Sequence, residues 1–213
     1  MSLKREFTFI CSKIVKDSVL KKPLFYNSNF SIRFDLQTES NSIEDYFDEN
    51  YYRSLLLFND CIDENDEIII CIQQYVYKKK TKIHKQNFLL KQIKLERSKY
   101  IFYKVRNLYD KSDCYNRLLI KTKYKNTHIE NIIKGIAHID YPNRSPQLVK
   151  SISQLGIEIY FLNVKNEILF NMYDDRGLDI AASNIEVLRD IYNRRNDWIL
   201  EYDKKEIIVK FNK

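Results

Sequence analysis

Three carboxylates lie within six residues of one another, at Asp174, Asp175 and Asp179. Carboxylate oxygens at such short spacing are ligands for Mg²⁺ or Mn²⁺, and a metal held in this way supports phosphodiester hydrolysis. Neighbouring strand residues point to opposite faces, so Asp174 and Asp175 converge only if a turn brings them together. A metal-dependent hydrolase or nuclease is therefore one hypothesis, but we predict neither a metal site nor a catalytic residue from it.

The same residues have an ordinary structural interpretation as a tight turn. We expect Gly177 to adopt a positive φ, the aspartates to accept backbone N–H groups, and Arg176 to pair with a nearby carboxylate. Trp198, the single tryptophan, is predicted to anchor the core. The predicted structural signature comprises Tyr173, Asp174, Asp175, Arg176, Gly177, Asp179 and Trp198.

Positive charge is concentrated in one stretch of the chain. Residues 78–125 hold 16 Lys and Arg against 3 Asp and Glu, whereas the whole sequence has a formal net charge of +7. Tyrosine and phenylalanine are interleaved with these cations, a mixture typical of grooves that follow a phosphate backbone and stack bases. The candidate binding residues are Lys78, Lys79, Lys80, Lys82, Lys85, Lys121 and Lys123.

Two interpretations of this basic segment stay open. Lysines along the edge and solvent face of a sheet prevent pairing with other chains, and the acidic residues of the N-terminal part would neutralise them. Alternatively, the segment is a surface for nucleic acid, an acidic protein or a phosphorylated ligand.

Motifs of the common enzyme classes are absent from the sequence. His84, His128 and His138 lack the spacing of a metal-binding helix, and Gly135, Gly156 and Gly177 are too few and too scattered for a phosphate-cradling loop. The four cysteines are far apart, without a C-x-x-C pair, so we expect reduced thiols. We predict no cofactor, and we do not expect an enzyme.

Apolar spacing predicts an α+β fold, an antiparallel β-sheet with helices packed on it. The C-terminal part is expected to form a β-meander followed by a helix. Strands are predicted over 30–36, 67–77, 100–109, 115–124, 157–162, 168–173 and 178–182. Helices are predicted over 43–59 and 86–97. A third helix is predicted to begin at a capping box of Thr127 and Glu130 and to end near His138, and a fourth to begin at a cap formed by Ser183 with Glu186. Residues 198–202 are expected to close the fold.

The length and composition favour one domain over residues 1–213, with a possible seam near 126. That seam would divide an N-terminal part, 1–125, which contains the basic segment 78–125, from a C-terminal part, 126–213. Apolar runs are far shorter than the roughly 20 residues that cross a bilayer, and no signal-peptide pattern is found. We expect a cytoplasmic protein without a membrane partner.

Two patterns carry a resemblance to a known family. They are Y-D-D-R-G-x-D at residues 173–179 and N-x-W-x-L-x-Y-D at residues 196–203. With the turn at Asp140 and the segments around Arg33 and Tyr51, they resemble the bacterial domain-of-unknown-function family 3885. The resemblance is strongest over 126–211 and weakest over 78–125. It implies one continuous fold in a bacterial cytosolic protein, and it supplies no activity and no catalytic residue.

Because the well-formed patterns are structural, the leading hypothesis is a non-enzymatic protein-interaction module, such as an accessory or immunity-like protein. An exposed aromatic or apolar patch would support it. The alternatives are a nucleic-acid-binding protein that uses residues 78–125, and the metal-dependent hydrolase or nuclease with Asp174, Asp175 and Asp179.

Overall fold

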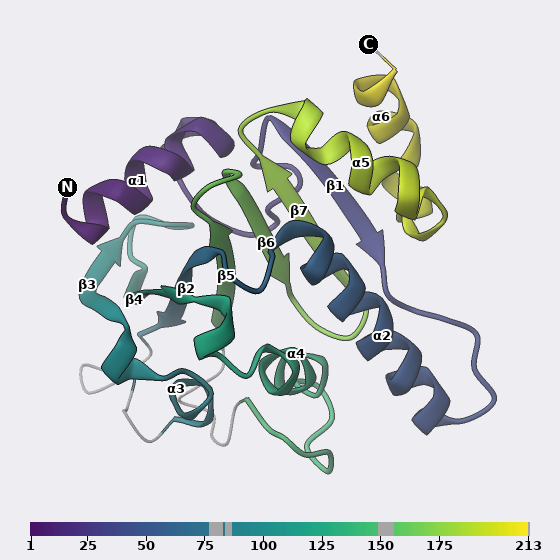
Figure 1. The fold of residues 1–213 in the computed structure, drawn as a ribbon, viewed down its shortest axis with the longest axis horizontal. Helices are drawn as coiled ribbons and strands as arrows, with labels where there is room; N and C mark the ends of the chain where they lie inside the picture. Colours follow the sequence, from purple (N-terminus) through teal and green to yellow (C-terminus); the bar gives the residue numbers. More distant parts are fainter. Residues whose placement is uncertain (77–82, 84–86, 149–155, 213) are drawn as a thin grey trace.

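The computed structural model describes residues 1–76, 83, 87–148 and 156–212. Seven strands form one sheet in the order β1-β7-β6-β5-β2-β4-β3, and every neighbouring pair is antiparallel (Figure 1). The strands are β1 (Phe30–Asp35), β2 (Glu67–Tyr75), β3 (Lys99–Arg106), β4 (Cys114–Lys123), β5 (Ile157–Asn163), β6 (Ile168–Met172) and β7 (Gly177–Ala182).

Helices cover both faces of the sheet. They are α1 (Leu3–Ile14), α2 (Ile43–Cys61), the short α3 (Phe88–Lys91), α4 (Ile129–Ala137), α5 (Ile185–Arg195) and α6 (Glu201–Phe211). The α1 helix packs on one face through Phe7, Ile10 and Ile14. On the other face, Phe58 of α2 meets Phe161 of β5 and Phe170 of β6 edge to face, in a larger core that α4 and α5 complete. The α+β prediction is confirmed.

Apolar alternation explains why the strands lie as they do. In β7, Leu178 and Ile180 belong to the core under α2, whereas Ala181 belongs to the core under α1. The period of two thus assigns each residue of the strand to one face or the other. The predicted C-terminal meander is present as β5, β6 and β7 in adjacent order, followed by α5.

Four predictions about helices and their caps are wrong. The Thr127 hydroxyl donates to the carbonyl of Tyr124 at 2.6 Å, so no capping box forms there. The α5 helix is capped by Asn184 and not by Ser183, because the Asn184 side chain accepts the Glu186 N–H. The span 86–97 contains the four-residue α3 and a 3-10 turn at Leu95–Arg97 in place of a helix. Beyond residue 200 the chain continues as α6, which was not predicted.

None of the helices in the described residues has the length and apolar character required to cross a membrane.

Candidate functional site

The turn between β6 and β7 is held by its own aspartate. Asp174 accepts the backbone N–H of Arg176 at 2.8 Å and the Arg176 Nε at 3.0 Å. The guanidinium of Arg176 also reaches Asp140, 3.5 Å away, in the loop that follows α4. The predicted turn chemistry of these two residues is therefore observed, and it connects the turn to the α4 loop.

Asp175 is buried and joins three segments. Its Oδ2 accepts the hydroxyl of Tyr46 at 2.7 Å and that of Tyr141 at 3.3 Å, and its carbonyl accepts the amide of Asn50. Tyr46 and Asn50 belong to α2, and Tyr141 belongs to the loop after α4. The carboxylate thus fixes the position of α2 and of that loop against the sheet.

Gly177 is required for space and not for backbone conformation. It has no positive φ, which corrects the expectation from the turn pattern. A Cβ at this position would lie 2.9 Å from the carbonyl oxygen of Phe34 and would overlap the hydroxyl of Tyr173. The glycine therefore lets Tyr173 and the backbone of β1 approach closely.

Asp179 has a different environment. It accepts Arg33 Nε at 2.8 Å and the N–H of Phe25 at 2.9 Å. Arg33 continues to Asp203 of α6 at 3.2 Å, and Asp203 accepts the hydroxyl of Tyr26 at 2.8 Å. This network of buried charges connects β1, β7 and the start of α6.

The three carboxylates do not converge. Asp175 contacts α2 on one face of the sheet, whereas Asp179 follows Leu178 in the strand and points to the opposite face. Within the described ranges, no group of three His, Cys, Asp or Glu side chains could hold a metal ion. The geometry gives no support to the metal-dependent hydrolase.

Trp198 is half-buried and lies between two arginines. The guanidinium carbons of Arg53 and Arg195 each lie 5.1 Å from its ring centroid. The ring packs against the larger core. Its contacts therefore combine apolar packing with cation–π stacking.

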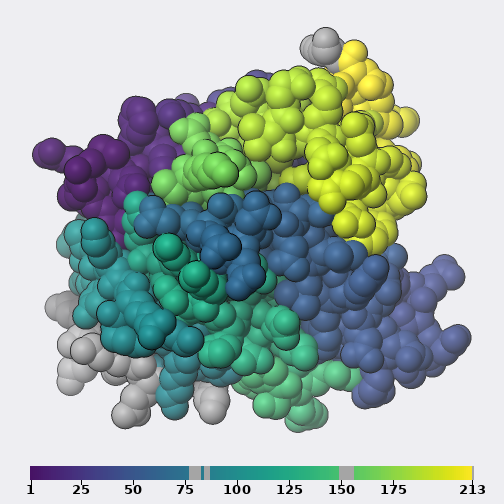
Figure 2. Space-filling model, in the orientation of Figure 1, coloured from purple at the N-terminus to yellow at the C-terminus, as the bar shows by residue number. Residues whose placement is uncertain are grey.

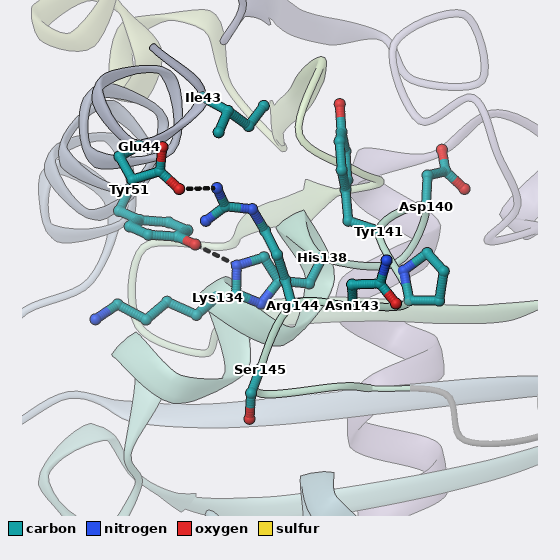
Figure 3. A pocket seen from close by; sticks show the side chains of 11 residues that line it. Ile43, Glu44, Tyr51, Lys134, His138, Asp140, Tyr141, Asn143, Arg144 and Ser145 are labelled. Carbon is teal, nitrogen blue, oxygen red and sulfur yellow. Dashed lines mark hydrogen bonds and ion pairs between the residues drawn. The ribbon is translucent and has the colours of Figure 1, made fainter.

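A pocket of about 650 Å³ opens between the start of α2 and the end of α4 (Figure 3). Its base is a hydrogen bond between the hydroxyl of Tyr51 and Nε2 of the buried His138. Because the carbonyl of Pro146 accepts from Nδ1 at 2.9 Å, Nδ1 carries the proton and Nε2 accepts from the tyrosine. The residues around it are Ile43, Glu44, Lys134, Asp140, Tyr141, Pro142, Asn143, Arg144 and Ser145.

Two cations flank the base of this pocket. The Nζ of Lys134 lies 5.3 Å from the ring centroid of Tyr51, and Arg144 pairs with Glu44 at 3.0 Å. Burial lowers the pKa of His138 from its ordinary value of 6.5; the carbonyl of Pro146 opposes this shift, and the charges of Arg144 and Lys134 add to it. His138 is therefore neutral at pH 7.

The pocket was not predicted from the sequence. The sequence predicts a helix that ends near His138, and this residue lies at the C-cap of α4. The signal that could have indicated more is the spacing of four between Lys134 and His138, which puts both on one helix face.

The basic segment is only partly described. Lys78, Lys79, Lys80, Lys82 and Lys85 lie outside the described residues. Lys121 is neutralised by Glu6 at 2.7 Å and Glu67 at 3.3 Å, whereas Lys123 is exposed. The two described lysines of the predicted binding set thus differ, one being a structural ion pair and one a surface charge.

The β3 strand forms one end of the sheet. Its side chains alternate between exposed and half-buried, and Tyr100 and Phe102 are 57% and 49% exposed. Beside these two rings is an apolar groove of about 410 Å³, which is also lined by Leu90, Leu95 and Leu118 among others. The groove and the pocket share no lining residue.

Comparison with known proteins adds a family but no activity. A family model described as "Domain of unknown function (DUF3885)" matches residues 8–203. The chain is 27% identical over 164 residues to "Uncharacterized protein YnaE" of Bacillus subtilis (strain 168), a match that covers 71% of this chain and 74% of that protein. No solved structure matches the chain.

Proposed function

Since the chain belongs to a family of unknown function, DUF3885, we propose its role from the geometry: it is a protein-interaction module that adds an acidic, extended segment of a partner to β3. The observation that carries this proposal is the exposed aromatic edge of the sheet at β3. In an accessory or immunity-like role, β3 would pair with an extended segment of the partner protein.

The two edge strands of the sheet differ in whether another segment bonds to their outer main-chain groups. At β1, the N–H of Leu200 donates to the carbonyl of Arg33 at 3.0 Å, and Ile199 forms a bridge with Phe34. The segment before α6 therefore occupies part of that edge, around Arg33 and Phe34. At β3, the strand partner is β4, and among the described residues no strand pairs with the outer edge, whose main-chain groups are the ones that a further strand would bond.

Exposed aromatic side chains distinguish β3 from an edge strand that is merely protected against pairing with other chains. Lysine alone would be enough to discourage strand pairing. Tyr100 and Phe102 instead stand beside the apolar groove, where alternate side chains of an added strand would find contacts. Figure 2 shows this teal segment at the surface, at the end of the visible face opposite to the yellow helix α6.

The positive charge of β3 indicates which kind of strand would pair with it. β3 contains Lys99, Lys104 and Arg106 and no acidic residue. If a second copy paired with it antiparallel about its centre, Lys99 would lie opposite Arg106 at both ends, and like charges placed directly opposite destabilise a pair. A strand with Asp or Glu at those positions removes this repulsion, so we favour an acidic partner over a second copy.

A peptide selection tests the proposal without a known partner. The immobilised protein is exposed to a library of short random peptides, and the proposal expects enrichment of sequences that alternate apolar and acidic residues. Phe102→Ala and Tyr100→Ala should each weaken the selected peptides roughly tenfold. Tyr52→Ala, at a tyrosine of α2 that is also 57% exposed, is the matched control and should leave binding unchanged. Equal binding by Phe102→Ala would overturn the proposal.

Nucleic acid is the second candidate for the same surface. Exposed lysines and arginines beside Tyr100 and Phe102 are also the elements of a single-strand binding surface. This alternative predicts an affinity for short RNA that falls steeply as salt rises, and its loss when Lys78, Lys79, Lys80 and Lys82 are reversed in charge.

We also propose a cytoplasmic location. Its support is that Cys11, Cys61, Cys71 and Cys114 are all free thiols, as expected in a reducing compartment.

A further inference from the structure

The pocket between α2 and α4 has the dimensions of a small-molecule site. Its volume of about 650 Å³ lies within the range of roughly 300 to 1,000 Å³ that ligand sites occupy. The ring of Tyr141 and the side chain of Ile43 give it an apolar wall, and Figure 3 shows Arg144 reaching across the opening towards Glu44. Polar and apolar contacts are thus offered on different sides.

The loop that forms one wall is held in place. The side-chain amide of Gln147 donates to the carbonyls of Arg144 at 2.6 Å and Tyr141 at 2.7 Å. Tyr141 is bound in turn by Asp175, and His138 by the carbonyl of Pro146. A ligand that entered the pocket would meet a wall already ordered, which reduces the entropy lost on binding.

The two cations of the pocket are available to an anion. Among the described residues, no carboxylate oxygen lies within 4.0 Å of the Lys134 Nζ, the distance that defines an ion pair. Arg144 is paired, but its partner Glu44 has a side chain that is 72% exposed. The Arg144 side chain is 24% exposed and contacts Glu44 through a single N–O pair, so another anion in the pocket can compete with Glu44 for the guanidinium.

We propose that this pocket binds a small organic anion, a carboxylate or phosphate ester with a compact apolar body. Its charged group takes the position of the Glu44 carboxylate on Arg144, with Lys134 as the second cation. Its apolar body lies against Tyr141 and Ile43. Asn143 and Ser145, which also line the opening, supply neutral hydrogen-bond donors. The site is separate from β3 and goes beyond the protein-interaction role.

Isothermal titration calorimetry with phenyl phosphate and with benzoate tests the proposal. At least one probe should bind the wild-type protein saturably, and whichever binds identifies the anion as phosphate or carboxylate. Arg144→Gln should weaken that binding about 10- to 100-fold, because a charge-assisted contact is lost. Glu44→Gln should tighten it, because the internal competitor for Arg144 is removed.

The exposed pair Arg189 and Glu186 on α5 provides matched controls, since it has the same chemistry away from the pocket. Arg189→Gln and Glu186→Gln should leave binding of either probe unchanged. A gain of affinity in Glu44→Gln is not produced by misfolding, so the test does not depend on the stability of the Arg144 variant. The proposal is overturned if neither probe binds, or if the Glu44 and Arg144 variants bind as the wild type does.

Discussion

Single residues in the family pattern act as structural connections. Asp175 links two tyrosines from different segments, and Gly177 makes room where β1, β7 and Tyr173 meet. The turn chemistry of Asp174 and Arg176 was predictable from the sequence, because those contacts are local. The contacts of Asp175 were not, because they depend on side chains more than thirty residues away in sequence.

Replacement of Gly177 by alanine tests the packing argument. The added methyl group would lie against the carbonyl of Phe34 and the hydroxyl of Tyr173, so we expect a loss of about 1–3 kcal/mol in the free energy of unfolding. Urea denaturation measures it. Gly135→Ala in α4 is the control. Its methyl group would contact a side-chain atom of Phe88 and no backbone atom at close range, and alanine has a higher helix propensity than glycine. Equal stability of the two variants would contradict the argument.

His138 gives the protein a defined dependence on pH. Its pKa is lower in the folded protein than its ordinary 6.5, so below pH 6.5 the unfolded chain binds a proton that the folded chain does not. Stability is therefore complete above pH 6.5 and falls as the pH drops from there towards the folded pKa, by at most about 1.4 kcal/mol per pH unit. Urea titrations at pH 7.5 and 5.5 should show a smaller difference for His138→Asn than for the wild type. An identical difference would exclude His138 as the cause.

At the scale of elements, apolar spacing was enough to find the strands and α2, because burial on one face imposes a period on the sequence. The caps were mistaken because the Thr127 hydroxyl donates to the carbonyl of Tyr124, and because Asn184, next to Ser183, accepts the Glu186 N–H. The α6 helix was missed because its buried side is a narrow stripe, Asp203, Ile207 and Phe211. The pocket lies between α2 and the loop after α4, which are far apart in the sequence, so residue spacing does not reveal it.

The position of α6 depends on Arg33. This arginine is the cation between Asp179 and Asp203, both of which are buried. Arg33→Met should therefore cost about 3–5 kcal/mol, because it leaves two carboxylates without their partner. Urea denaturation measures the loss, and amide hydrogen exchange should be fastest in α6. Arg189→Met, at an exposed ion pair, should lose far less; a similar loss in both would show that Arg33 has no special role.

For the whole molecule, we propose one domain across residue 126. The support is that β2, before this position, pairs with both β4 and β5, which lie on either side of it. Thermal unfolding should show one cooperative transition by near- and far-ultraviolet circular dichroism, and the fragments 1–125 and 126–213 should not fold when expressed alone. A fragment with its own cooperative transition would mean that a seam divides the chain.

The central claim is that β3 accepts a further strand, and amide hydrogen exchange on the complex with a selected acidic peptide tests it most directly. Strand addition forms main-chain hydrogen bonds, so the account predicts new protection of amides within Lys99–Arg106, with no change at β1, whose edge is bonded at Arg33 to the segment before α6. Protection at β1, or none at β3 when the peptide is bound, would contradict the account.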